Sequence, residues 1–169
     1  SYLVSTDPKK AKVFTENRAE VYRYILSQKE RTLVLLEDEL AFTHQYTALL
    51  DLRFGNALHF KRHFNGDADK QYLIPPTSVF VALENAVKHN EISEKHPLRV
   101  DISLADNKLI ITNKMRLKRN LGTSGGIGLK NLDERFKIAT GQGIKAGELA
   151  QNVFQVTLPL IKLAGNVYA

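Results

Sequence analysis

The 169-residue sequence contains no cysteine, which excludes disulfide bonds and cysteine-ligated zinc and permits a reducing compartment. It also has no run approaching the ~20 apolar residues that a membrane helix needs. The first residues do not have the pattern of a signal peptide. We therefore expect this segment to make no contact with a membrane, and any membrane anchor to lie outside it.

Low-complexity tracts are absent as well, and 43% hydrophobic with 25% charged residues is an ordinary balance for a globular domain. The 24 basic and 18 acidic residues give a formal charge of +6, which by itself suggests nucleic acid as a partner. The basic residues are scattered, however, except for a local cluster at Lys114, Arg116, Lys118 and Arg119. We predict no nucleic-acid partner, because no such motif accompanies the cluster and a positive loop attracts a triphosphate equally well.

Apolar periodicity predicts two helices at the start of the chain, over residues 8–28 and 36–54, the first beginning at Asp7 and Pro8. Further along we expect a strand over 56–64, a helix capped by Thr77 or Ser78 and ending near 90, a hairpin over 99–112, a helix ending near 139 and a hairpin over 144–160. This order predicts an α/β two-layer sandwich, with a mixed, mostly antiparallel sheet and helices on one face, preceded by a helical segment.

The helix ending near residue 90 carries Asn85 and Lys88, which are three residues apart and therefore lie on one face. An amide oxygen is a hard ligand that suits Mg²⁺, and a lysine ammonium interacts with phosphate as a point charge. Taken alone, the pair is more commonly the solvated face of an amphipathic helix, although asparagine is a poor residue for a helix interior.

A glycine-rich turn, Gly122–Gly128, leads directly into the next helix. Glycines let the backbone approach a ligand closely, and the free N–H groups of a first helical turn attract anions with roughly 0.3–1 kcal/mol each. The turn is neither a Walker A sequence nor a dinucleotide fingerprint, because no Gly-Lys-Ser/Thr follows. A lone glycine cluster is usually a flexible loop, but together with Asn85 it predicts a phosphate site.

Two stretches resemble the motifs of a known fold: Leu83–Asn90 is similar to the N-box, and Gly125–Leu132 to the G-box, of the GHKL (Bergerat) ATP-binding fold. Their sequences, Glu-Asn-Ala-x-Lys-His and Gly-Ile-Gly-Leu-x-Asn-Leu, resemble the motifs of sensor histidine kinases of the LytS/YehU type. Upstream, Arg23–Leu26, Leu36–Leu40 and Arg53–Phe54 also resemble that family. The resemblance implies a remnant of the dimerisation and phosphoacceptor region over 1–30, a catalytic domain over 31–163 and a frayed tail over 164–169.

The resemblance implies ATP and Mg²⁺ as cofactors, with Asn85 on the metal and a lid over 114–124. The nucleotide-binding residues it implies are Asn85, Lys88, His89, Asn113, Gly125, Gly126, Ile127, Gly128 and Leu129.

Two positions depart from the wider GHKL pattern. Asn113 replaces an aspartate that accepts from the adenine amino group, and the glycines after it are missing; the loss costs about 0.5–1.5 kcal/mol and does not exclude ATP. Val81 replaces the carboxylate with which ATP-hydrolysing members activate water, whereas a kinase does without that base. Glu84 points about 100° away from Asn85 and is expected to be structural.

The resemblance implies a protein histidine kinase that transfers the γ-phosphate of ATP to a histidine upstream of this segment, for relay to a response regulator of the LytTR type. It further implies a homodimer in the full-length protein, and a cytoplasmic domain of a bacterial protein anchored in the inner membrane. The acceptor motif of the family, Pro-His-Phe-Leu-Phe-Asn, is absent, so none of His44, His59, His63, His89 and His96 is expected to be phosphorylated in cis.

Two alternatives stay open. One is a degenerate GHKL module that binds nucleotide weakly or acts as a scaffold. The other is a serine kinase of the anti-sigma-factor type, which is weaker because the Arg-Tyr-x-Leu helix is a histidine-kinase feature.

Overall fold

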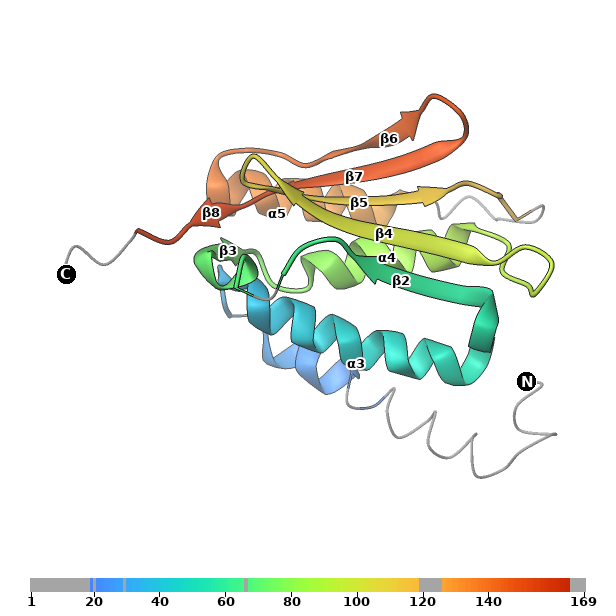
Figure 1. Cartoon of the computed structure of the whole chain (residues 1–169). Helices are drawn as coiled ribbons and strands as arrows, with labels where there is room; N and C mark the ends of the chain where they lie inside the picture. The colour runs from blue at the N-terminus through green and yellow to red at the C-terminus, as the bar shows by residue number, and fades with distance from the viewer. Residues whose placement is uncertain (1–18, 20, 29, 66, 119–125, 165–169) are drawn as a thin grey trace.

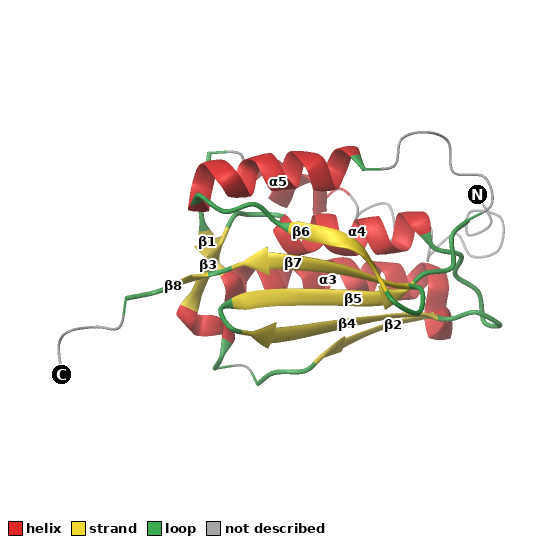
Figure 2. Ribbon diagram, turned by 90° about the horizontal axis from the view of Figure 1, so that it is seen from above, coloured by secondary structure: helices red, strands yellow, loops and turns green. Residues whose placement is uncertain are grey.

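A computed structural model describes residues 19, 21–28, 30–65, 67–118 and 126–164 of the chain. The described part has two layers, a five-stranded sheet and a layer of helices that covers one of its faces (Figures 1 and 2). This arrangement confirms the predicted α/β sandwich. The predicted helix start at Asp7, the glycine at 125 and the end of the tail lie outside the described residues.

The large sheet is mixed and mostly antiparallel, as predicted. Its order is β2-β4-β5-β7-β6, in which β2 and β4 are parallel and all other neighbours are antiparallel. The strands are β2 (Leu58–Arg62), β4 (Leu98–Ala105), β5 (Lys108–Lys114), β6 (Lys145–Leu149) and β7 (Val153–Pro159). Asp106 and Asn107 join β4 to β5 with φ angles of 49° and 56°, the backbone conformation that a tight hairpin requires.

Three helices lie side by side on one face of this sheet (Figure 2). They are α3 (Leu36–Phe54), α4 (Ser78–His89) and α5 (Ile127–Thr140). Residues 21–27 form a further helical stretch before them. No helix within the described ranges has the length and apolar character needed to cross a bilayer.

A small second sheet, in the order β1-β3-β8, closes one end of the molecule. It consists of β1 (Val34–Leu35), β3 (Tyr72–Ile74) and β8 (Ile161–Lys162). Two short 3₁₀ helices, η1 (Gly55–Ala57) and η2 (Asp69–Gln71), complete the described elements.

The core lies between the sheet and the helices. Alternate residues of the central strands point inward and are buried, as the period of two in a strand dictates: Val100, Ile102, Leu109, Ile111, Val156 and Leu158. They face the buried residues of α4 and α5, which recur at helical spacing: Val79, Ala82, Leu83, Ala86, Leu132 and Phe136. This burial fixes α4 and α5 against the sheet.

Aromatic side chains connect the helical stretch 21–27 to the domain. Tyr24 stacks on Phe42 of α3 with ring centroids 3.8 Å apart, and Phe80 of α4 lies 5.8 Å from Phe42 and 4.7 Å from Tyr46. Residues 21–27 thus pack on α3 of the domain. The division of the chain at residue 30 stays a prediction.

Candidate functional site

The helix α4 presents the three predicted residues of its motif at its C-terminal half. Asn85 and His89 are half-buried and Lys88 is exposed. Burial, and then the charges of Lys88 and Lys118, lower the pKa of His89 below its usual value. His89 is therefore neutral at physiological pH and able to donate or accept a hydrogen bond.

The start of α5 is an open set of backbone donors. Gly126 precedes the helix with φ 107° and ψ −17°, a conformation that favours glycine. The N–H of Lys130 donates to the carbonyl of Gly126 at 2.9 Å, so the N–H groups of Ile127, Gly128 and Leu129 have no acceptor within the helix. Among the described residues no side chain caps this end. Such an end attracts anions.

The two helices run antiparallel and touch through small groups. A Cβ atom on Gly128 would lie 3.7 Å from Cγ1 of Val81, so the first turn of α5 faces the middle of α4. Seven residues later, Nη1 of Arg135 donates to the hydroxyl of Thr77 at 2.9 Å and to the carbonyl of Pro76 at 2.7 Å. Later residues of α5 thus contact earlier residues of α4. These contacts fix the orientation of the two helices, and of the sequence motifs on them, relative to each other.

The chain that leaves β5 is tied to the opposite end of α4. The N–H of Arg116 donates to Oδ1 of Asn90 at 2.6 Å, and the N–H of Glu91 donates to the carbonyl of Arg116 at 2.7 Å. Lys118 makes three further hydrogen bonds to this end of α4. Its N–H donates to the carbonyl of His89 at 3.1 Å. Its ammonium donates to the carbonyls of Val87 and Lys88, at 3.2 and 2.8 Å.

Lys118 is therefore a cation at the negative end of a helix, where it satisfies carbonyls that have no partner in the helix itself. Burial, followed by the charge of Arg53, lowers the pKa of Lys118. Of the predicted lid, residues 114–118 are described, and the remainder lies outside the described residues.

These contacts place Asn85 between two anchoring points. Lys118 is held at His89, and Gly128 faces Val81, each four residues from Asn85 along α4. Four residues are about 6 Å of helix, roughly one turn. The sequence motifs of α4 and α5 therefore lie together in the fold.

Asn113, the predicted adenine contact, is buried on β5, where it pairs with Val100 and Phe154. It alternates with Thr112 and lies on the same sheet face as Ile111, the face that the helices cover. Its Nδ2 donates to the carbonyl of Lys114 at 3.1 Å. Gly125 lies outside the described residues.

The start of α4 is held differently from the prediction. Thr77 precedes the helix in the left-handed conformation with φ 62°. Neither Thr77 nor Ser78 caps the helix with its side chain, so the predicted capping by one of them is wrong. The buried carboxylate of Glu39 does so from α3, accepting the N–H of Thr77 at 2.9 Å and that of Val79 at 3.1 Å. The hydroxyl of Ser78 donates to the carbonyl of Pro75 instead.

Burial raises the pKa of Glu39 to about 7, although the backbone N–H groups and the charge of Arg135 oppose this change. Sequence reasoning missed both Glu39 and Arg135. The sequence does contain an indication that Glu39 is buried. It lies three residues after Leu36 and three before Phe42, on the apolar stripe of α3. A carboxylate on such a stripe needs hydrogen-bond donors in the core.

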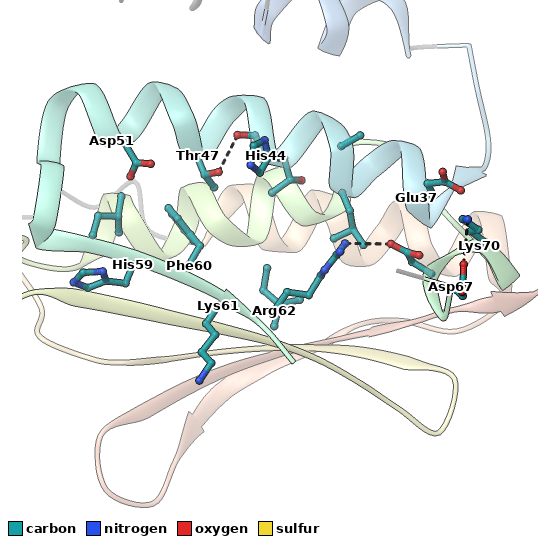
Figure 3. A pocket seen from close by; sticks show the side chains of 16 residues that line it. Glu37, His44, Thr47, Asp51, His59, Phe60, Lys61, Arg62, Asp67 and Lys70 are labelled. Carbon is teal, nitrogen blue, oxygen red and sulfur yellow. Dashed lines mark hydrogen bonds and ion pairs between the residues drawn. The ribbon is translucent and has the colours of Figure 1, made fainter. Parts of the chain in front are cut away.

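A separate groove of about 850 Å³ lies between α3 and β2 (Figure 3). Its lining mixes polar and apolar side chains: His44, Thr47 and Asp51 line it from α3, and Arg62 pairs with Asp69 at 3.2 Å on its far side. None of the predicted nucleotide residues lines this groove.

The five histidines are dispersed over the described fold. His44 and His59 line the groove, and Nε2 of His63 lies 2.5 Å from the carboxylate of Asp101. His96 is in the turn before β4, bonded through its backbone to Ser93. The absence of an acceptor histidine stays a prediction.

Comparison with known proteins gives consistent matches. The family model described as histidine kinase matches residues 1–58. The sensor protein kinase HptS of Staphylococcus aureus is 28% identical over 109 residues, which are 64% of this chain. The chain spans only 20% of the length of that relative.

Two solved structures share the fold. The cytoplasmic segment of histidine kinase QseC aligns with a TM-score of 0.51 and 14% identity, over 88% of this chain and 94% of that one. The catalytic domain of histidine kinase ThkA, in a nucleotide-free form, aligns with a TM-score of 0.50 and 13% identity, over 75% and 95% of the two chains. Each of these matches is to a histidine kinase or a sensor protein kinase, and the described part of the chain shares the fold of histidine kinase catalytic domains.

Proposed function

We propose that this chain binds Mg-ATP along α4 and the start of α5, as the catalytic domain of a sensor histidine kinase. One observation carries the proposal: Asn85 lies on α4 one turn from each of two contacts. On one side Lys118 is hydrogen-bonded to His89, and on the other Gly128 faces Val81. A hard oxygen ligand, a lysine and a helix start that no described side chain caps thus occur together, as a metal–triphosphate ligand requires.

The described residues fit this ligand chemically. Asn85 supplies a neutral oxygen of the kind that Mg²⁺ accepts alongside phosphate and water, and Lys88 supplies an exposed positive charge. Among the described residues the N–H groups of Ile127, Gly128 and Leu129 have no acceptor, so they can donate to phosphate oxygens. Neutral His89 adds one donor, and the carbonyl of Asn113 accepts from the adenine amino group. When bound, Mg²⁺ neutralises charge on the phosphates.

The proposed reaction is transfer of the γ-phosphoryl group to a histidine outside this chain. Val81 supports transfer over hydrolysis, because an apolar side chain packed towards Gly128 cannot activate water. The nucleophile is the imidazole nitrogen of the acceptor, so positioning and charge neutralisation suffice.

The wider role is also proposed. The chain would act within a homodimeric protein anchored in the inner membrane, as part of its cytoplasmic region, and would pass phosphate on to a response regulator of the LytTR type. The resemblance of the motifs and the similarity to a sensor protein kinase support this role.

Isothermal titration with Mg-ATP tests the binding step. We expect binding by the wild-type chain and loss of the Mg²⁺-dependent part in Asn85→Ala. Glu84→Ala is the matched control, since Glu84 is the exposed neighbour on the same helix and should leave affinity unchanged. Absence of both heat and a thermal shift at millimolar nucleotide rejects the proposal and favours a scaffold module.

Labelling with γ-³²P-ATP tests the transfer step. This chain alone should take up no label, whereas a longer protein that includes the upstream region should carry an acid-labile phosphate. Acid-stable phosphoserine on a partner would favour the anti-sigma-factor type of kinase instead.

A further inference from the structure

The first turn of α4 is held by side chains from both neighbouring helices. Glu39 of α3 accepts the N–H groups of Thr77 and Val79, and Arg135 of α5 donates to the carbonyl of Pro76 and the hydroxyl of Thr77. We refer to Glu39 and Arg135 as the α4 clamp. The clamp replaces a local cap, because Thr77 provides none from its own side chain.

The α4 clamp acts on a strained position. Thr77 is left-handed although it is not glycine, a conformation that costs free energy and persists only where surrounding groups determine it. Glu39, Thr77 and Ser78 are all buried, so water does not replace the hydrogen bonds of the clamp. Removing either side chain therefore leaves buried polar backbone without a partner.

The clamp also links the two proposed nucleotide motifs. Val79 precedes Asn85 by six residues, about 9 Å along α4, and Arg135 follows Gly128 by two turns of α5 on the same face. A shift of the first turn of α4 would move Asn85 relative to the amides of Ile127, Gly128 and Leu129.

We propose that Glu39 and Arg135 are positioning residues of the nucleotide site, which act by fixing the first turn of α4 against α5 without touching the ligand. This inference rests on the proposed function. It assigns a role to two side chains that lie outside both sequence motifs.

The test combines Mg-ATP affinity with local amide hydrogen exchange, at a temperature well below the unfolding of every variant and at a pH above the Glu39 pKa of about 7, where both of its oxygens are acceptors. Glu39→Gln keeps the size of the side chain but can accept only one of the two N–H groups. We expect about tenfold weaker binding of Mg-ATP and faster exchange confined to the first half of α4. Glu37→Gln, an exposed acid two residues earlier on α3, is the matched control and should change neither quantity.

Arg135→Met provides a second arm, because it keeps the apolar stem and removes the bonds to Pro76 and Thr77. It should weaken binding to a similar extent, and the double variant should lose less than the product of the two effects, since both act on one turn. A folded Glu39→Gln or Arg135→Met with wild-type affinity and wild-type exchange in α4 overturns the inference. If the wild-type chain binds no nucleotide, the proposed function fails while the exchange of α4 still tests the clamp.

Discussion

At the scale of single residues, Asn113 is the proposed contact to the adenine ring. Its amide is buried on β5 and its Nδ2 is engaged with the carbonyl of Lys114, which leaves its own carbonyl as the acceptor for an amino group. A carboxylate at this position would make a stronger, charge-assisted bond, about 1 kcal/mol better than a neutral one.

We therefore expect Asn113→Asp to tighten ATP binding roughly fivefold, while GTP, whose ring has a carbonyl at that place, gains nothing. The substitution also loses the bond to Lys114 and should lower the melting temperature. Titration with both nucleotides checks this, and equal effects on ATP and GTP would remove Asn113 from the adenine contact.

Lys118 is a second residue whose role is local. Its ammonium donates to two carbonyls at the C-terminal end of α4, so Lys118→Met should lower the free energy of unfolding by about 0.5–1.5 kcal/mol. Lys114→Met removes an exposed lysine of β5 and serves as the control. Urea unfolding of the two variants provides the measurement; equal stabilities would show that the two bonds contribute nothing.

At the scale of elements, replacing either of two glycines at the start of α5 by alanine should have opposite effects on stability. Gly128 is helical and an added Cβ would meet only an ordinary contact with Val81, so Gly128→Ala should stabilise the fold by about 0.5–1 kcal/mol. Gly126 has φ 107°, and Gly126→Ala should destabilise it by about 1–2 kcal/mol.

Both variants should weaken Mg-ATP binding, because each places a methyl group beside the exposed amides. Gly128→Ala is the more informative, since it separates affinity from stability: the melting temperature should rise while the affinity falls. Unchanged affinity in Gly128→Ala would argue against phosphate at the start of α5.

The elements themselves followed from the sequence, because long periodic stretches such as α3 and the β4–β5 hairpin with its Asp106–Asn107 turn carry strong local signals. The meeting of α4 and α5 was reached through the resemblance of their motifs. The capping of α4 was not predictable in the same way. A local hydroxyl was the expected cap, and the actual acceptor, Glu39, is 38 residues away in sequence.

At the scale of the whole molecule, Glu39 makes stability depend on pH. Its pKa is raised from 4.5 to about 7 in the folded state, so between these values the folded chain binds more protons at Glu39 than the unfolded chain. The contribution of protonated Glu39 to the free energy of unfolding is therefore complete below pH 4.5 and is lost as pH rises to 7. The neighbours Tyr24, whose pKa is raised to about 12, and Arg135 do not titrate there.

We expect the difference in unfolding free energy between wild type and Glu39→Gln to fall by up to about 3 kcal/mol from pH 4.5 to 7 and to stay constant above. Denaturant unfolding across this range measures it, and the histidines cancel because both proteins have them. A flat difference for Glu39→Gln would show that its carboxyl titrates normally.

The parallel pairing of β2 and β4 bears on the order in which the molecule assembles. The hairpins β4–β5 and β6–β7 close short loops, whereas β2 meets β4 only through a crossover that contains α4. Closing a long loop costs more chain entropy, so we expect the hairpins to form first and α4 to dock late. A nucleotide held on α4 would then slow unfolding and leave the refolding rate almost unchanged, which stopped-flow measurements with and without Mg-ATP can distinguish.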